Sequence, residues 1–134
     1  MLKKTIPYTD YEGVDRVEDF YFNINKAELS EMQLSQPGGF VKMIQKISAE
    51  QDGPKIVQLF KDLVLNSYGE KSPDGKRFIK EPERTKAFSQ TEAYVNLYME
   101  ISNDAKAASA FVKGILPKDL VDQAELDDPT LKLM

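Results

Sequence analysis

Pairs of neighbouring carboxylates come closest to a catalytic or metal-binding pattern in this sequence. The pairs are Glu18 with Asp19, Glu28 with Glu31, and Asp127 with Asp128. Paired carboxylates can serve acid–base chemistry or hold a divalent cation. A calcium loop needs ligands at alternate positions over about 12 residues, and none of the pairs follows that pattern. We therefore expect solvated surface carboxylates and no metal site.

Histidine and cysteine are both absent from the sequence. Histidine is the side chain best suited to proton transfer near neutral pH, and cysteine supplies thiolate nucleophiles and zinc ligands. Ser–His–Asp and Cys–His catalysis are therefore excluded. The glycines in Gly38-Gly39 and Gly75-Lys76-Arg77 lack the spacing of a phosphate-binding loop. We expect a protein that is not an enzyme and that holds no cofactor.

Basic residues gather between positions 71 and 86. They are Lys71, Lys76, Arg77, Lys80, Arg84 and Lys86, interleaved with Glu70, Asp74, Glu81 and Glu83. A solvated loop of mixed charge explains this pattern. The alternative is a contact for an acidic protein partner, in which Phe78 and Ile79 help the loop to order on binding. On that alternative, Lys76, Arg77 and Phe78 are candidate partner-binding residues.

The composition indicates one domain. The chain has 134 residues, of which 41% are hydrophobic and 30% charged, with a net charge of −4. This suits one core, and residues 1–123 are predicted to form a single globular domain. The mild acidity argues against nucleic acid or an anionic membrane as a partner. No signal-peptide pattern or apolar run of about 20 residues is present, so we expect a cytoplasmic protein.

A β-hairpin is predicted at 3–24. Apolar residues alternate with polar ones on both sides of the turn signal Asp10-Tyr11-Glu12-Gly13, and Pro7 suits an edge strand. Helices are predicted at about 26–34, 39–51, 54–68, 90–113 and 117–122, followed by a flexible acidic tail at 124–134. The predicted fold class is α+β, mostly α: an N-terminal β-hairpin followed by a bundle of about five helices and a disordered acidic C-terminal tail.

Local signals refine the predicted helix ends. Asn25 and Glu28 have the spacing of a capping box, as do Ser89 and Glu92. Gly69 suits the position after a helix C-terminus. In the long helix, Ser102-Asn103-Asp104 can interrupt or recap the helix, because short polar side chains compete for backbone hydrogen bonds.

Four segments in this order resemble one known family. They are Tyr8–Gly13 with Glu18–Asn23 and Asn25–Leu29; Phe60–Leu63 with Ser67–Ser72; Asp74–Phe78; and Ser89–Tyr94. Together they resemble the tail assembly chaperones of siphophages and prophages of Gram-positive bacteria. The resemblance covers roughly residues 5–120. It implies a helical, non-catalytic protein that binds the apolar tape measure protein, helps major tail (tube) protein subunits polymerise around it, and leaves the finished virion.

Partner binding of this kind calls for apolar residues that the core does not need. Phe40, Met43, Tyr98 and Met99 are the candidates on the predicted helices, although Tyr98 also fits a core-facing stripe. Self-association is left open. Two other functions fit a small catalysis-free protein: a structural virion component, such as a head–tail connector or tail completion protein, and a small inhibitor of a host protein.

Overall fold

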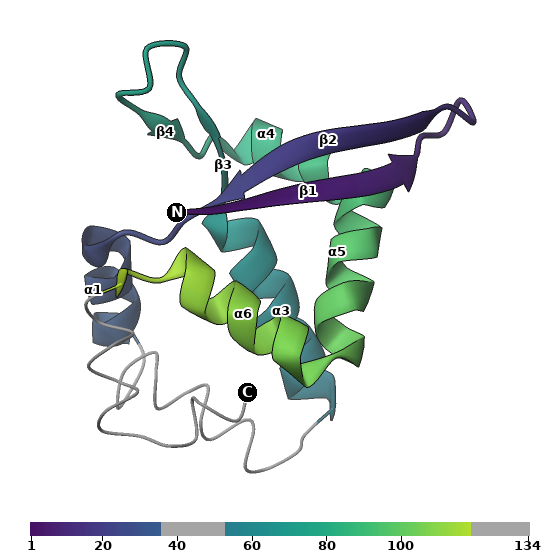
Figure 1. The fold of residues 1–134 in the computed structure, drawn as a ribbon. Helices are drawn as coiled ribbons and strands as arrows, with labels where there is room; N and C mark the ends of the chain where they lie inside the picture. Colours follow the sequence, from purple (N-terminus) through teal and green to yellow (C-terminus); the bar gives the residue numbers. More distant parts are fainter. Residues whose placement is uncertain (36–52, 119–134) are drawn as a thin grey trace.

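An antiparallel sheet and a set of helices form the fold (Figure 1). The computed structural model describes residues 1–35 and 53–118. Its strands follow the order β1 (Leu2–Thr9), β2 (Asp15–Phe22), β3 (Tyr68–Lys71) and β4 (Phe78–Ile79), and each is antiparallel to its neighbour. The described helices are α1 (Lys26–Ser35), α3 (Gly53–Ser67), α4 (Pro82–Ser89), α5 (Glu92–Asn103) and α6 (Ala105–Ile115).

The predicted fold class, a hairpin followed by a helical bundle, is wrong. The hairpin supplies half of a 4-stranded sheet, and the other two strands lie in the sequence between α3 and α4. Gly69, predicted to follow a helix, lies buried in β3 and pairs with Tyr21 of β2. The added strands have 4 and 2 residues. Strands this short carry little alternation, so tertiary pairing decided their conformation.

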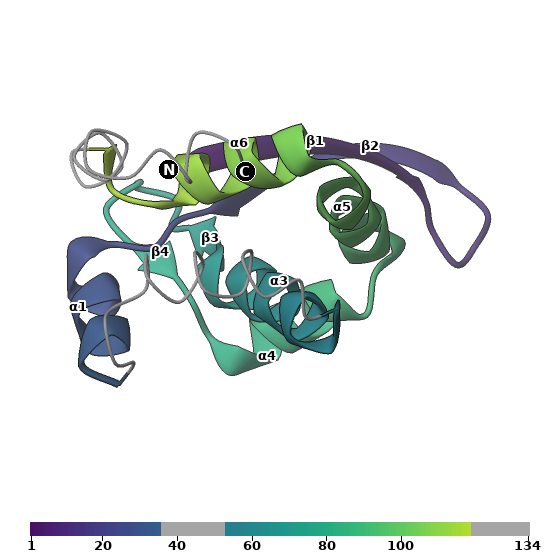
Figure 2. The same ribbon diagram turned by 90° about the horizontal axis from the view of Figure 1, so that it is seen from below.

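The β1–β2 hairpin places one face of its strands against the helices. Ile6 is buried, and Leu2, Tyr8 and Phe20 are partly buried against the same core. The alternate residues of β1, Thr5 among them, are exposed, as the period of two requires. Gly13 supplies the positive φ of the turn, at 80°. The hairpin extends beyond α5 as an arm in both views (Figures 1 and 2).

An aromatic cluster joins the sheet to the helices. Phe22 of β2 packs edge-on against Tyr68, Phe88 and Phe111, with ring centroids 5.4–5.9 Å apart. Tyr68 and Phe88 are stacked, with centroids 4.2 Å apart and an interplanar angle of 4°. All four side chains are buried. The cluster therefore ties β2, β3, α4 and α6 into one core.

Two predicted helices have close counterparts. The α1 helix corresponds to the helix predicted at 26–34. Its predicted capping box is confirmed: Asn25 N donates to Glu28 Oε1 at 3.0 Å, and Glu28 N donates to Asn25 Oδ1 at 2.8 Å. The α3 helix corresponds to the helix predicted at 54–68. The predicted helix 39–51, the candidates Phe40 and Met43, and residues 119–134 lie outside the described residues.

The predicted long helix at 90–113 is divided into two. Asp104 separates α5 from α6 and caps α6, accepting from Lys106 N at 2.9 Å and Ala107 N at 3.4 Å. Thr91 caps α5, whereas Ser89 is the last residue of α4, a helix the sequence reasoning missed. None of the described helices has the length and apolarity needed to cross a membrane.

Candidate partner-binding groove

An open groove of about 1070 Å³ runs between the helices. It is lined by Ile24; Glu28 and Glu31 of α1; Val57, Lys61, Leu65 and Asn66 of α3; Lys80; Pro82, Thr85, Lys86 and Ser89 of α4; and Tyr94, Val95 and Tyr98 of α5. By volume, such a groove accommodates roughly two to three turns of an α-helix, whose diameter is about 10 Å. It suits a peptide segment better than a small cofactor.

The side chains of α5 form three stripes along the helix. One stripe faces the core, and each of the other two contributes residues that line the groove. Ala93, Leu97 and Ile101 point into the core and are fully buried. The neighbouring stripe, Tyr94 and Tyr98, is half-buried and lines the groove. In the sequence, these two kinds of residue fall on one predicted stripe, because periodicity alone does not separate positions three and four apart.

The third stripe of α5 is exposed. Val95 is 41% exposed and lines the groove, whereas Met99, one turn later and 48% exposed, does not. Val57 of α3 is 53% exposed on the groove. Exposed aliphatic side chains beside half-buried tyrosines form the apolar part of the groove, which is the character of a docking surface.

The tyrosine rings are held in place by aromatic contacts. The Tyr94 ring packs edge-on against Phe88 at 5.8 Å between centroids and lies 6.1 Å from the Tyr98 ring. Burial, followed by the charges of Tyr98 and Asp62, raises the pKa of Tyr94 above its ordinary value of 10.0. Tyr94 therefore stays neutral at physiological pH, and its ring presents a fixed apolar surface.

Lysines border the apolar part of the groove. Lys80 Nζ donates to Glu28 Oε2 at 2.7 Å and to the Asn23 carbonyl oxygen at 2.5 Å, which ties α1 to the segment before α4. Lys61 and Lys86 are exposed, and neither forms an ion pair with another residue of the described ranges. The groove thus offers two ammonium groups to an incoming carboxylate.

The candidate partner-binding residues of the basic loop lie outside the groove. Lys76 and Arg77 are exposed in the β3–β4 turn, which is closed by Ser72: its hydroxyl donates to Asp74 at 2.6 Å, and its amide donates to the Arg77 carbonyl at 2.9 Å. Phe78 is half-buried with its ring against Gly69. Of the predicted partner-binding residues that are described, the structure places Tyr98 in the groove and Lys76, Arg77, Phe78 and Met99 outside it.

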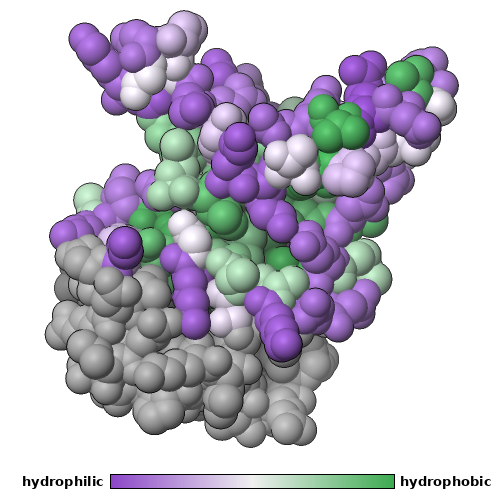
Figure 3. Space-filling view, in the orientation of Figure 1, coloured by the Kyte–Doolittle hydropathy of each residue, from purple (hydrophilic) through white to green (hydrophobic). Residues whose placement is uncertain are grey.

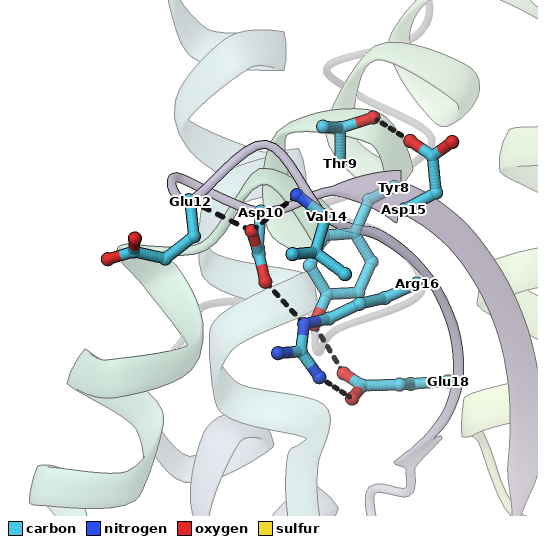
Figure 4. Close-up of polar contacts among 8 residues, drawn as sticks. All are labelled: Tyr8, Thr9, Asp10, Glu12, Val14, Asp15, Arg16 and Glu18. Carbon is cyan, nitrogen blue, oxygen red and sulfur yellow. Dashed lines mark hydrogen bonds and ion pairs between the residues drawn. The ribbon is translucent and has the colours of Figure 1, made fainter.

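Polar contacts fix the tip of the β1–β2 arm (Figure 4). Asp10 accepts from Glu12 N at 2.9 Å, from Val14 N at 3.0 Å and from Arg16 Nε at 2.5 Å. The Arg16 guanidinium, with the backbone amides behind it, lowers the pKa of Asp10 below its ordinary value of 3.8. Tyr8 donates to Glu18 on the same face. The turn that joins the strands is therefore ordered by its own side chains.

Exposed apolar side chains also lie on this arm. Tyr11 is 75% exposed, Val14 50% and Val17 69%. The Glu92 carboxylate at the start of α5 raises the pKa of Tyr11 on this arm above its ordinary value of 10.0. Figure 3 shows apolar residues on the upper-right projection, which is the β1–β2 arm, and on the surface below it. The arm is a second exposed surface, separate from the groove.

The described residues hold no group of three or more aspartate or glutamate side chains placed to bind a metal ion. A family model described as phage tail assembly chaperone matches residues 1–132. No curated protein and no solved structure matches the chain.

Proposed function

The chain belongs to the phage tail assembly chaperone family, and from this premise we propose that it binds the tape measure protein of its phage and promotes assembly of the tail tube around it. In this proposal the protein acts by binding and catalyses no reaction. Its partners are the tape measure protein and the major tail (tube) protein. It acts in the host cytoplasm during assembly and is absent from the mature virion.

The groove between α3, α4 and α5 is the observation that carries this proposal. It combines exposed aliphatic groups, Val57 and Val95, with the half-buried ring of Tyr98. An amphipathic helix buries one apolar stripe and keeps its polar face in water, so such a groove suits it. Covering the apolar stripes of a long helical client would keep that client from aggregating.

The open form of the groove also favours release. Two exposed valines and part of a tyrosine ring offer only a small apolar area, and buried apolar area contributes roughly 25 cal/mol per Å² at most. Binding of each client segment is therefore expected to be modest. Tube subunits that cover the same client stripes over a larger area can then displace the chaperone.

Co-expression tests the proposal. The tape measure protein of the same genome is expressed alone and together with this chain, and its soluble fraction and co-purification are measured. We expect a soluble complex, and we expect mass spectrometry to find no copy of the chain in finished particles. An insoluble tape measure protein with no bound chain, together with the chain in finished particles, would instead favour a structural virion component.

A further inference from the structure

The net charge of the chain resides in its last 16 residues. Residues 119–134 contain Asp119, Asp122, Glu125, Asp127 and Asp128 against one basic residue, Lys132, and so carry −4. The whole chain also carries −4, and residues 1–118 therefore hold equal numbers of acidic and basic side chains. Leu120, Val121 and Leu126 lie between the carboxylates, and Leu131 and Leu133 follow the last of them. The segment combines negative charge with aliphatic side chains.

The groove carries basic and aliphatic side chains, which complement the acidic and aliphatic side chains of residues 119–134. Lys61 on α3 and Lys86 on α4 are exposed and form no ion pair within the described part of the chain. The exposed valines Val57 on α3 and Val95 on α5 line the same groove. Two carboxylates also line the groove: Glu28, which is paired with Lys80 at 2.7 Å, and Glu31. A segment that carries both carboxylates and aliphatic side chains can pair with the lysines and cover the valines.

The described chain ends close to the groove. The carbonyl oxygen of Ile115, the last residue of α6, accepts a hydrogen bond from Ile24 N at 2.7 Å. Ile24 lines the groove, and Lys118 is the last described residue. A segment of 16 residues reaches roughly 50 Å when extended, at about 3.3 Å per residue. Residues 119–134 therefore start near the groove and are long enough to cross it.

We propose that the acidic segment 119–134 occupies the groove of its own chain when no partner is bound. Its carboxylates meet Lys61 and Lys86, and its leucines cover Val57 and Val95. A client segment must then displace it, which makes the groove available only to partners that bind more tightly than the tethered segment. The displacement step rests on the proposed function, whereas the docking of the segment does not.

The absence of cysteine allows a direct test in the full chain. Val95→Cys combined with Leu126→Cys places one thiol in the groove and one in the segment. The matched control combines Leu126→Cys with Val17→Cys, since Val17 is a second exposed valine, on β2, outside the groove. Disulfide formation is followed under mild oxidation, without any partner, on non-reducing gels.

We expect the groove pair to form a disulfide within one chain at least tenfold faster than the control pair. Equal rates would overturn the proposal. Disulfide-linked dimers as the main product would also overturn it, in favour of a segment that docks on a second copy. A failure of this experiment leaves the co-expression result untouched, so the two proposals can fail separately.

Charge reversal makes the test specific. Adding Lys61→Glu and Lys86→Glu to the groove pair is expected to slow the reaction severalfold. Adding Asp127→Lys and Asp128→Lys as well is expected to restore it, because both partners then carry the opposite charge. A rate that does not respond to either exchange would contradict recognition of the segment by these lysines.

Discussion

The ring of Phe78 lies directly against the backbone of Gly69 across the β3–β4 pair. A Cβ atom at position 69 would lie 2.5 Å from Cε2 of that ring, closer than such atoms approach in proteins. Gly69 is therefore needed for close packing and not for a positive φ. The contact accounts for the half-buried position of Phe78 in the sheet.

Substitution of Gly69 with alanine is expected to destabilise the fold. Overpacking costs about 1–3 kcal/mol, and a gain of about 0.4–1 kcal/mol from the unfolded chain offsets part of it, so we expect a net loss of roughly 1–2 kcal/mol. Urea unfolding followed by circular dichroism measures it. The double variant Gly69→Ala, Phe78→Ala should lose less than the sum of the two single variants. Additive losses would show that the two residues do not compete for space.

Alkaline pH is expected to weaken the fold through Tyr68. Burial first, and then the Glu70 carboxylate, raise the pKa of this hydroxyl above its ordinary value of 10.0. The unfolded chain therefore releases the Tyr68 proton at lower pH than the folded one. The stabilisation is fully present below about pH 10 and is lost as the pH rises beyond it.

The matched variant for this prediction is Tyr68→Phe. It keeps the ring that stacks on Phe88 at 4.2 Å and removes the proton. Between about pH 8 and about pH 11, the midpoint of urea unfolding should fall more steeply for the unmodified protein than for the variant. Parallel curves would assign the alkaline loss to other groups.

Removal of the Asp104 side chain should weaken the start of α6. Its carboxylate accepts from two backbone amides, and loss of such a cap costs about 1 kcal/mol, within a range of 0.5–2. Asp104→Ala should therefore lower the free energy of unfolding by about that amount, while Asp104→Asn keeps most of it. The neighbouring change Ser102→Ala, at the exposed end of α5, serves as the control. An equal loss for Asn and Ala would show that the cap is not the cause.

Sequence patterns predicted the hairpin and its turn because local signals decide them. The alternation at Ile6 and Tyr8, the alternation at Phe20 and Phe22, and a glycine at position 13 that can adopt a positive φ are visible without tertiary knowledge. The capping box of Asn25 and Glu28 is equally local. The β3 strand could not be predicted in this way, since Tyr68 and Gly69 directly follow a strong helix and are extended because they pair with β2.

Of the residues that line the groove, only one was predicted from the sequence to bind a partner. Tyr98 was a candidate because tyrosine suits binding surfaces, but the helix register that separates Tyr98 from the buried Leu97 depends on the packing of α5. Val57 and Val95 look like ordinary core positions in the sequence. Their exposure depends on how far apart α3, α4 and α5 stand, which no local pattern reports.

The most direct test of the proposed function is co-purification of the tape measure protein with groove variants. The variant Val57→Asp, Val95→Asp changes two exposed groove residues from different helices, and Met99→Asp is its matched control on α5 outside the groove. Thermal unfolding first establishes that both variants fold. We expect at least about tenfold weaker binding for the groove variant, equivalent to about 1.4 kcal/mol, and no change for Met99→Asp. Unchanged binding of the folded groove variant would contradict the proposal. A loss at Met99→Asp alone would move the client site to Met99, which was a candidate from the sequence.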